Sequence, residues 1–120
     1  MVLIDSSPED MIARFEAADP SLAARLRAPS RGEAWDFGAI SAALNEHLWR
    51  TDIPLVVLTR GKVAKPDDPN EEIWLELQNE LALRSSHSTH TIATGSGHYI
   101  HLEQPALVID AVKRVIAGRP

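Results

Sequence analysis

The chain has 120 residues, which suits one domain or part of a larger one. Its formal net charge of −5 gives no electrostatic reason to bind nucleic acid or an anionic membrane surface, so we expect neither partner. The absence of cysteine excludes disulfides, thiol catalysis and Cys-ligated zinc, and no window approaches the roughly 20 apolar residues that a membrane span needs.

The first half of the sequence predicts one short strand followed by small helices. Val2–Ile4 is a short apolar run that predicts a strand, and Asp5 to Pro8 after it is typical of a turn. From residue 8 to about residue 50 the helical spacing is interrupted by proline and glycine. The last apolar stripe of this region, from Ile40 to Leu48, predicts a short helix that ends near Trp49. We therefore expect a cap-like helical segment over residues 8–50.

The second half alternates between strand and helix patterns. Ile53–Thr59 is a continuous apolar run, typical of a parallel strand covered on both faces. Asn70 is the predicted N-cap of a helix that continues to about Leu83. Thr89–Thr94 predicts a third strand, and a last helix begins at Pro105 with Gln104 as its N-cap and ends at Gly118. This order predicts an α/β fold in which three parallel strands are flanked by helices.

The loop after the third strand carries the most informative motif. Gly95-Ser96-Gly97-His98 is followed by Glu103-Gln104-Pro105 and an amphipathic helix. This arrangement resembles the C-terminal end of α/β-hydrolases, with Val2–Ile4, Ile53–Thr59 and Thr89–Thr94 in the places of the sixth, seventh and eighth strands. The resemblance implies that residues 1–120 are one partial α/β-hydrolase domain. It also implies that His98 is the general base of a catalytic triad.

The acid that would orient His98 has more than one candidate. The family commonly places it shortly after the seventh strand, but Gly61 is followed there by Lys62, Val63 and Ala64. Some family members place the acid after the sixth strand, and Asp5 stands at that position. The resemblance favours Asp5, with Asp68 or Asp67 as alternatives. Asp5 could instead cap the helix that follows it.

The nucleophile that the family requires is missing from the sequence. No Gly-x-Ser-x-Gly occurs anywhere in the 120 residues, and the oxyanion loop is missing too. Ser96 lies only two residues from His98 and is badly placed to serve it, while Ser85 and Ser86 have no flanking glycines. The resemblance therefore implies a hydrolase acting on ester or similar bonds that is incomplete as this chain. The alternative is a non-catalytic truncated or split module that oligomerises or binds a partner.

The partners follow from the same reasoning. We expect a small-molecule substrate if a nucleophile-bearing half complements the chain, and no cofactor is implied. If the chain stands alone, residues 2–4 form an unpaired apolar edge, which we expect to associate with a second copy or a partner chain. A signal peptide is not evident after Met1, so we expect a cytoplasmic protein.

Two further patterns are open to more than one interpretation. His87-x-x-His90 and His98-x-x-His101 have a spacing found in metal sites, but neither has a companion cysteine, so we expect no metal. Three tryptophans could line a pocket, although tryptophans on helices more often serve core or cap packing. They are Trp35, Trp49 and Trp74.

Overall fold

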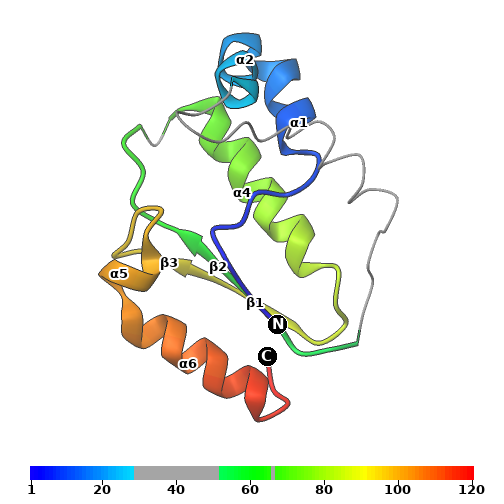
Figure 1. Ribbon diagram of the computed structural model, residues 1–120, viewed down its shortest axis with the longest axis vertical. Coiled ribbons are helices and arrows are strands. Elements are labelled where there is room, and N and C mark those ends of the chain that lie inside the picture. The colour runs from blue at the N-terminus through cyan, green and yellow to red at the C-terminus, as the bar shows by residue number, and fades with distance from the viewer. Residues whose placement is uncertain (29–51, 66) are drawn as a thin grey trace.

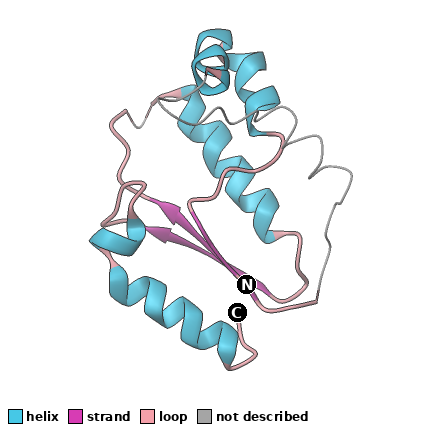
Figure 2. Ribbon diagram, in the orientation of Figure 1, coloured by secondary structure: helices cyan, strands magenta, loops and turns pink. Residues whose placement is uncertain are grey.

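Three parallel strands form one sheet with helices on both of its faces (Figure 1). The computed structural model describes residues 1–28, 52–65 and 67–120. The predicted α/β fold with three parallel strands and flanking helices is confirmed, and Figure 2 shows the strands lying between the two groups of helices. In chain order the elements are β1 (Val2–Ile4), α1 (Met11–Ala18), α2 (Pro20–Arg27), β2 (Leu55–Arg60), α4 (Pro69–Ala82), β3 (Ser88–Ala93), α5 (Ile100–Glu103) and α6 (Pro105–Ile116).

Strand β2 is the centre of the sheet because β1 and β3 both pair with it. In the parallel register Val2 lies opposite Val56, and Leu55 lies opposite Ser88. The four residues from Leu55 to Leu58 have no exposed surface, as the continuous apolar run predicts. The strand begins two residues later than predicted. Pro54 precedes it and has no N–H to donate to the sheet.

Alternate residues of β2 bury against opposite helices. Val56 and Leu58 pack with Ile100 and with Ala111 on the α6 face of the sheet. Leu55 and Val57 pack with the end of α4 on the other face, next to Leu81 and Ala82. This alternation follows from the two-residue period of a strand, and it divides the core into two layers.

Helix α4 begins before the predicted N-cap. Asp68, not Asn70, is the N-cap residue, and its Oδ1 atom accepts hydrogen bonds from the Asn70 backbone N–H and side-chain amide, both at 2.9 Å. Pro69 occupies the first helical position, where its missing N–H is not needed. The predicted N-cap at Asn70 is therefore wrong by two residues.

The described part of the cap-like segment packs on α4. A cluster of buried side chains joins α1, α2 and α4, and Arg14 on α1 forms ion pairs with Glu76 and Glu80. The predicted interruption at Pro20 is confirmed: α1 ends at Ala18, and Pro20 begins α2, whose first turn is capped by Asp19. The cluster consists of Met11, Ile12, Phe15, Ala23, Trp74 and Leu77. The short helix predicted near residues 40–49 lies outside the described residues.

Helix α6 covers the other face of the sheet only with part of its apolar surface. Val108 and Val115 pack against the sheet, whereas Ile109, Val112 and Ile116 are exposed. The helix ends at Ile116, two residues before the predicted end at Gly118, whose φ of 71° lies in the left-handed region that glycine adopts easily. Among the described residues, no helix is long and apolar enough to cross a membrane.

The central strand gives the first testable prediction. Replacing Leu58 by alanine removes a fully buried side chain between β2 and α6. We expect the free energy of unfolding to fall by about 2–5 kcal/mol, measured by urea denaturation. Leu83→Ala is the control because this leucine is 75% exposed, and its effect should stay within about 0.5 kcal/mol. Similar losses for both variants would contradict the burial of β2.

Candidate functional site

The carboxyl ends of β1 and β2 bring two opposite charges together. Asp5 directly follows β1, and its backbone N–H continues the ladder with a 2.7 Å bond to the Leu58 carbonyl. Arg60 is the last residue of β2. The φ of Asp5 is 43°, in the left-handed region that aspartate and asparagine tolerate better than most residues. Strand β1 therefore ends in a turn at Asp5, beside the end of β2.

The Asp5 carboxylate is buried and accepts four hydrogen bonds. Its Oδ1 atom accepts from the Arg60 backbone N–H at 3.1 Å and from the Trp74 indole N–H at 3.0 Å. Its Oδ2 atom accepts from Arg60 Nη1 at 3.0 Å and lies 2.8 Å from Nδ1 of His98. The side chain has no exposed surface, so these donors replace the water that a buried carboxylate loses. The carboxylate is held at both oxygens.

Two opposing effects act on the protonation of Asp5. Burial works to raise its pKa, but hydrogen bonds from His98 and from the backbone and side chain of Arg60, with the positive charge of Arg60, outweigh burial. The net effect lowers the pKa of Asp5 below its ordinary value. The group is therefore a carboxylate at neutral pH.

His98 lies on the loop after β3 and contacts Asp5 across 93 residues of sequence. Because a carboxylate only accepts hydrogen bonds, the Nδ1 atom of His98 carries a proton in this pair. In the neutral ring the Nε2 atom then has the free lone pair. The His98 side chain is 61% exposed, so a solute can reach it while Asp5 stays buried.

Backbone and side-chain contacts fix the loop that carries His98. The Ser96 carbonyl accepts from the backbone N–H groups of Gly61 at 3.1 Å and Lys62 at 2.8 Å. The buried Ser96 hydroxyl donates to Gln104 Oε1 at 2.8 Å, and Glu103 accepts from the Gly97 N–H at 3.2 Å. The Glu-Gln pair of the motif thus folds back onto the loop. Gln104 precedes α6 as expected but makes no side-chain cap.

Among the described residues, neither alternative acid bonds to His98. Asp68 uses its side chain to cap α4. Asp67 and Asp68 both line a cavity that His98 does not line. Asp5, in turn, does not cap α1, which begins at Met11 after Asp10. Of the carboxylates proposed from the sequence, Asp5 is the one that the fold brings to His98.

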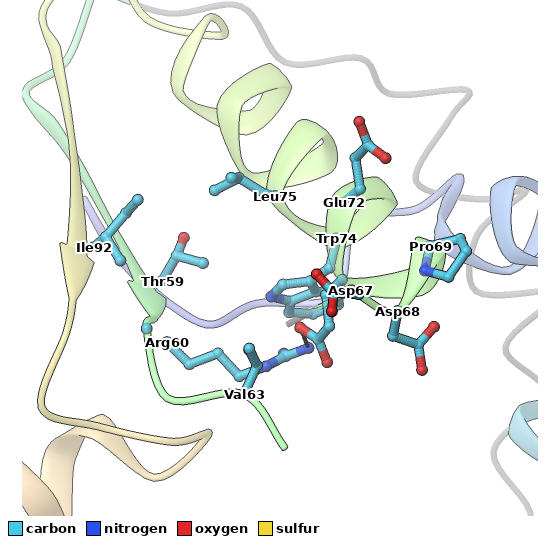
Figure 3. A pocket seen from close by; sticks show the side chains of 12 residues that line it. Thr59, Arg60, Val63, Asp67, Asp68, Pro69, Glu72, Trp74, Leu75 and Ile92 are labelled. Carbon is cyan, nitrogen blue, oxygen red and sulfur yellow. Dashed lines mark hydrogen bonds and ion pairs between the residues drawn. The ribbon is translucent and has the colours of Figure 1, made fainter. Parts of the chain in front are cut away.

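Arg60 and Trp74 are site residues that the sequence reasoning did not assign. The Arg60 guanidinium lies over the Trp74 ring, 4.6 Å from its centroid, and its Nη2 atom is 2.8 Å from Glu71 Oε2. Figure 3 shows Arg60 extending from the end of β2 towards the Trp74 indole. A charged residue directly after an apolar strand was the available signal for Arg60. Trp74 is buried in the core and also lines a cavity, so both interpretations of this tryptophan hold, and neither included its bond to Asp5. Trp35 and Trp49 lie outside the described residues.

A cavity of about 660 Å³ opens between the ends of β2 and β3 and the first turns of α4 (Figure 3). Arg60 and Trp74, which both bond to Asp5, belong to its wall, whereas Asp5 and His98 do not. The wall combines apolar and acidic side chains. Its residues are Thr59, Arg60, Gly61, Val63, Asp67, Asp68, Pro69, Glu71, Glu72, Trp74, Leu75 and Ile92.

The ring nitrogens of His90 are both engaged by neighbouring side chains. Asn79 Oδ1 lies 2.7 Å from Nδ1, and Thr59 Oγ1 lies 2.7 Å from Nε2. Burial lowers the pKa of His90, so the neutral ring is favoured and it joins α4 to two strands. Within the described ranges no three His, Asp or Glu side chains gather as ligands for a metal ion.

The described serines do not supply a nucleophile to His98. The Ser96 hydroxyl is buried and bonded to Gln104, and the Ser85 hydroxyl donates to the Ile53 carbonyl at 2.7 Å. No hydrogen bond joins a serine of residues 1–28, 52–65 or 67–120 to His98.

Comparisons with known protein families, curated proteins and solved structures found no match to this chain.

The close approach of Gly61 to β3 gives the second prediction. A Cβ atom at residue 61 would lie 2.6 Å from the Thr94 Cα atom, so Gly61→Ala must displace backbone. We expect a loss of about 1–3 kcal/mol in the free energy of unfolding. Gly97→Ala is the matched control, because its Cβ would meet its nearest neighbour, Glu103 Oε1, at 3.4 Å. Urea denaturation measures the free energy of unfolding of both variants. Equal losses in Gly61→Ala and Gly97→Ala would refute the proposed clash.

The protonation of Asp5 gives the third prediction. Since the pKa of Asp5 is lower in the folded chain than its ordinary value of 3.8, its charge stabilises the fold above about pH 4. That contribution is lost as the pH falls through the folded pKa. Asp5→Asn keeps a residue that tolerates the left-handed backbone, and we expect it to cost about 1–3 kcal/mol at pH 7. In urea unfolding experiments, the difference in free energy of unfolding between the unaltered protein and Asp5→Asn should become smaller below pH 4. A difference that does not change with pH would contradict the ionic role of Asp5.

Proposed function

We propose that His98 and Asp5 are the base and the orienting acid of an α/β-hydrolase-type enzyme that cleaves ester or similar bonds. The observation that carries this proposal is the 2.8 Å contact between His98 Nδ1 and the buried Asp5 carboxylate. An imidazole with one nitrogen bonded to a buried carboxylate and the other free is the arrangement that general-base catalysis requires.

The arrangement of the elements supports the resemblance to this family. The three strands lie in the order β1-β2-β3 and are parallel, which agrees with the sixth, seventh and eighth strands that the resemblance assigns. Asp5 follows the first of them, and His98 follows the third on a loop that leads into α5 and α6. Two residues from opposite ends of the sequence thus meet at the carboxyl edge of the sheet, where ligands of open α/β sheets bind.

His98 and Asp5 have different roles in the proposed reaction. His98 Nε2 takes the proton of an attacking hydroxyl and later returns it to the leaving group. Asp5 holds the ring in the Nδ1–H tautomer and stabilises the imidazolium that forms, without taking the proton itself. The attacking serine comes, in this proposal, from residues outside these 120, in a longer polypeptide or in a partner chain, because the sequence has no Gly-x-Ser-x-Gly.

Hydrolysis of p-nitrophenyl acetate by the chain tests the base directly. This activated ester reacts with imidazole alone, so we expect His98→Gln to lower the rate that the protein adds to the buffer. His101→Gln is the matched control, since His101 is also exposed and lies three residues away on α5. Equal rates for the unaltered protein and His98→Gln would rule out catalysis by His98 in this chain.

A serine-bearing polypeptide provides the stronger form of the test. An in-frame Gly-x-Ser-x-Gly upstream of Met1 in the coding DNA would supply the nucleophile. In a protein expressed with that segment, we expect His98→Gln to lower kcat by about 10²–10⁴. Full activity of that variant would contradict the proposed role of His98.

A second candidate is a non-catalytic module that associates through its uncovered surfaces. Strand β1 pairs with β2 on one side, and no strand from the described residues pairs with its other edge. Ile109, Val112 and Ile116 are exposed on α6, which packs against β1. An open strand edge beside exposed apolar residues favours association with a second copy or a partner chain.

Light scattering coupled to size-exclusion chromatography tests this association. We expect a species larger than the 13.2 kDa chain at micromolar concentrations, and Ile116→Glu should shift it towards the monomer. Leu83→Glu is the matched control, because Leu83 is similarly exposed at the end of α4. A stable monomer at every concentration would refute self-association.

A further inference from the structure

The Arg60 guanidinium bridges two carboxylates at the edge of the sheet. Its Nη1 atom is 3.0 Å from Asp5 Oδ2, and its Nη2 atom is 2.8 Å from Glu71 Oε2. Asp5 is fully buried, whereas the side chains of Arg60 and Glu71 are 19% and 27% exposed. Partial burial reduces solvent screening, so the charges of this group act on one another more strongly than on an open surface.

Arg60 and His98 share one oxygen atom of Asp5. Since both bond to Oδ2, at 3.0 Å and 2.8 Å, the guanidinium Nη1 and the imidazole Nδ1 lie within about 6 Å of each other. A carboxylate alone would stabilise the imidazolium form of His98. A guanidinium on the same oxygen opposes that stabilisation, because it neutralises the carboxylate and repels a second positive charge.

The geometry keeps this arrangement fixed. The other carboxylate oxygen of Asp5 is held by the Arg60 backbone N–H and the Trp74 indole N–H, so the carboxylate is held against rotation. The guanidinium also lies over the Trp74 ring, which favours a cation at that place. Arg60 therefore contacts Asp5 through its backbone and its side chain.

We propose that Arg60 is a positioning residue whose positive charge opposes protonation of His98 through the Asp5 oxygen they share, and that Glu71 weakens this effect because it bonds to the same guanidinium. The proposal rests on the proposed function only in naming His98 as the base. A base must be unprotonated to accept a proton, so the positive charge of Arg60 favours the form of His98 that can act.

The other charged and titratable groups on the elements around His98 and Arg60 are left unsubstituted in the Arg60 and Glu71 variants of the test. On the His98 loop and α5 these are Tyr99, whose ring centroid is 5.3 Å from that of His98, His101, and Glu103 with its ion-pair partner Lys62 on the loop after β2. On the side of α4, the carboxylates that line the cavity with Arg60 and Glu71 are Asp67, Asp68 and Glu72.

A titration of the His98 ring by NMR tests the proposal on the chain itself, with the resonance assigned by its loss in His98→Gln. We expect Arg60→Gln to raise the titration midpoint by about half to one pH unit. Arg60→Lys keeps the charge and should leave the midpoint near that of the unaltered protein. Glu71→Gln frees the guanidinium and should lower the midpoint.

Arg14→Gln is the matched control, because Arg14 also bridges two carboxylates of α4, Glu76 and Glu80, but does not contact Asp5. Its midpoint should equal that of the unaltered protein. Opposite shifts for Arg60→Gln and Glu71→Gln would support the proposal, since loss of structure alone gives no reason for opposite signs. If Arg60→Gln does not fold, the direction of the Glu71→Gln shift decides the question.

Three results would overturn the proposal. The first is a titration midpoint of His98 in Glu71→Gln equal to that of the unaltered protein. The second is a shift of the midpoint in the same direction in Arg60→Gln and Glu71→Gln. The third is a shift in Arg60→Lys as large as that in Arg60→Gln. None of these readings depends on ester hydrolysis. A failure of the proposed function appears instead as an unchanged hydrolysis rate in His98→Gln.

Discussion

The buried carboxylate of Asp5 is the constraint on which the rest of the site depends. A charged group without exposed surface must find hydrogen-bond donors inside the protein, and Asp5 finds them in β2, α4 and the His98 loop. The four hydrogen bonds therefore join three separate parts of the chain at one point. Loss of any donor would leave a buried charge less well compensated.

Trp74 connects Asp5 to helices α1 and α2, which pack on α4. Its indole N–H bonds to Asp5, while its ring belongs to the buried cluster formed with α1 and α2. The packing of Phe15 and Leu77 in that cluster thus helps to hold a donor of the site. The cap-like segment has a structural link to Asp5, although residues 29–51 lie outside the described part.

The sequence predicted the fold and the His98–Asp5 pair through different kinds of signal. The continuous apolar run of β2 predicted its burial directly, because a strand covered on both faces carries apolar side chains on both of them. Asp5 was favoured only through the resemblance to a family, and the 2.8 Å contact places it beside His98 without testing catalysis. The N-cap of α4 was misplaced because Asp68 and Asn70 are both good cap residues, and local preference does not choose between them.

By itself the sequence determined the order of strands and helices, the missing serine motif and the candidates for base and acid. The order of elements and the missing motif follow from local patterns and single residues, whereas the candidates for base and acid came through the resemblance to a family. Only the tertiary structure decided that Arg60 and Trp74 contact Asp5 and that the Gln104 side chain folds back onto Ser96. Such contacts join residues whose separation in the chain carries no periodic signal. They arise because the carboxyl ends of parallel strands meet at one edge of the sheet.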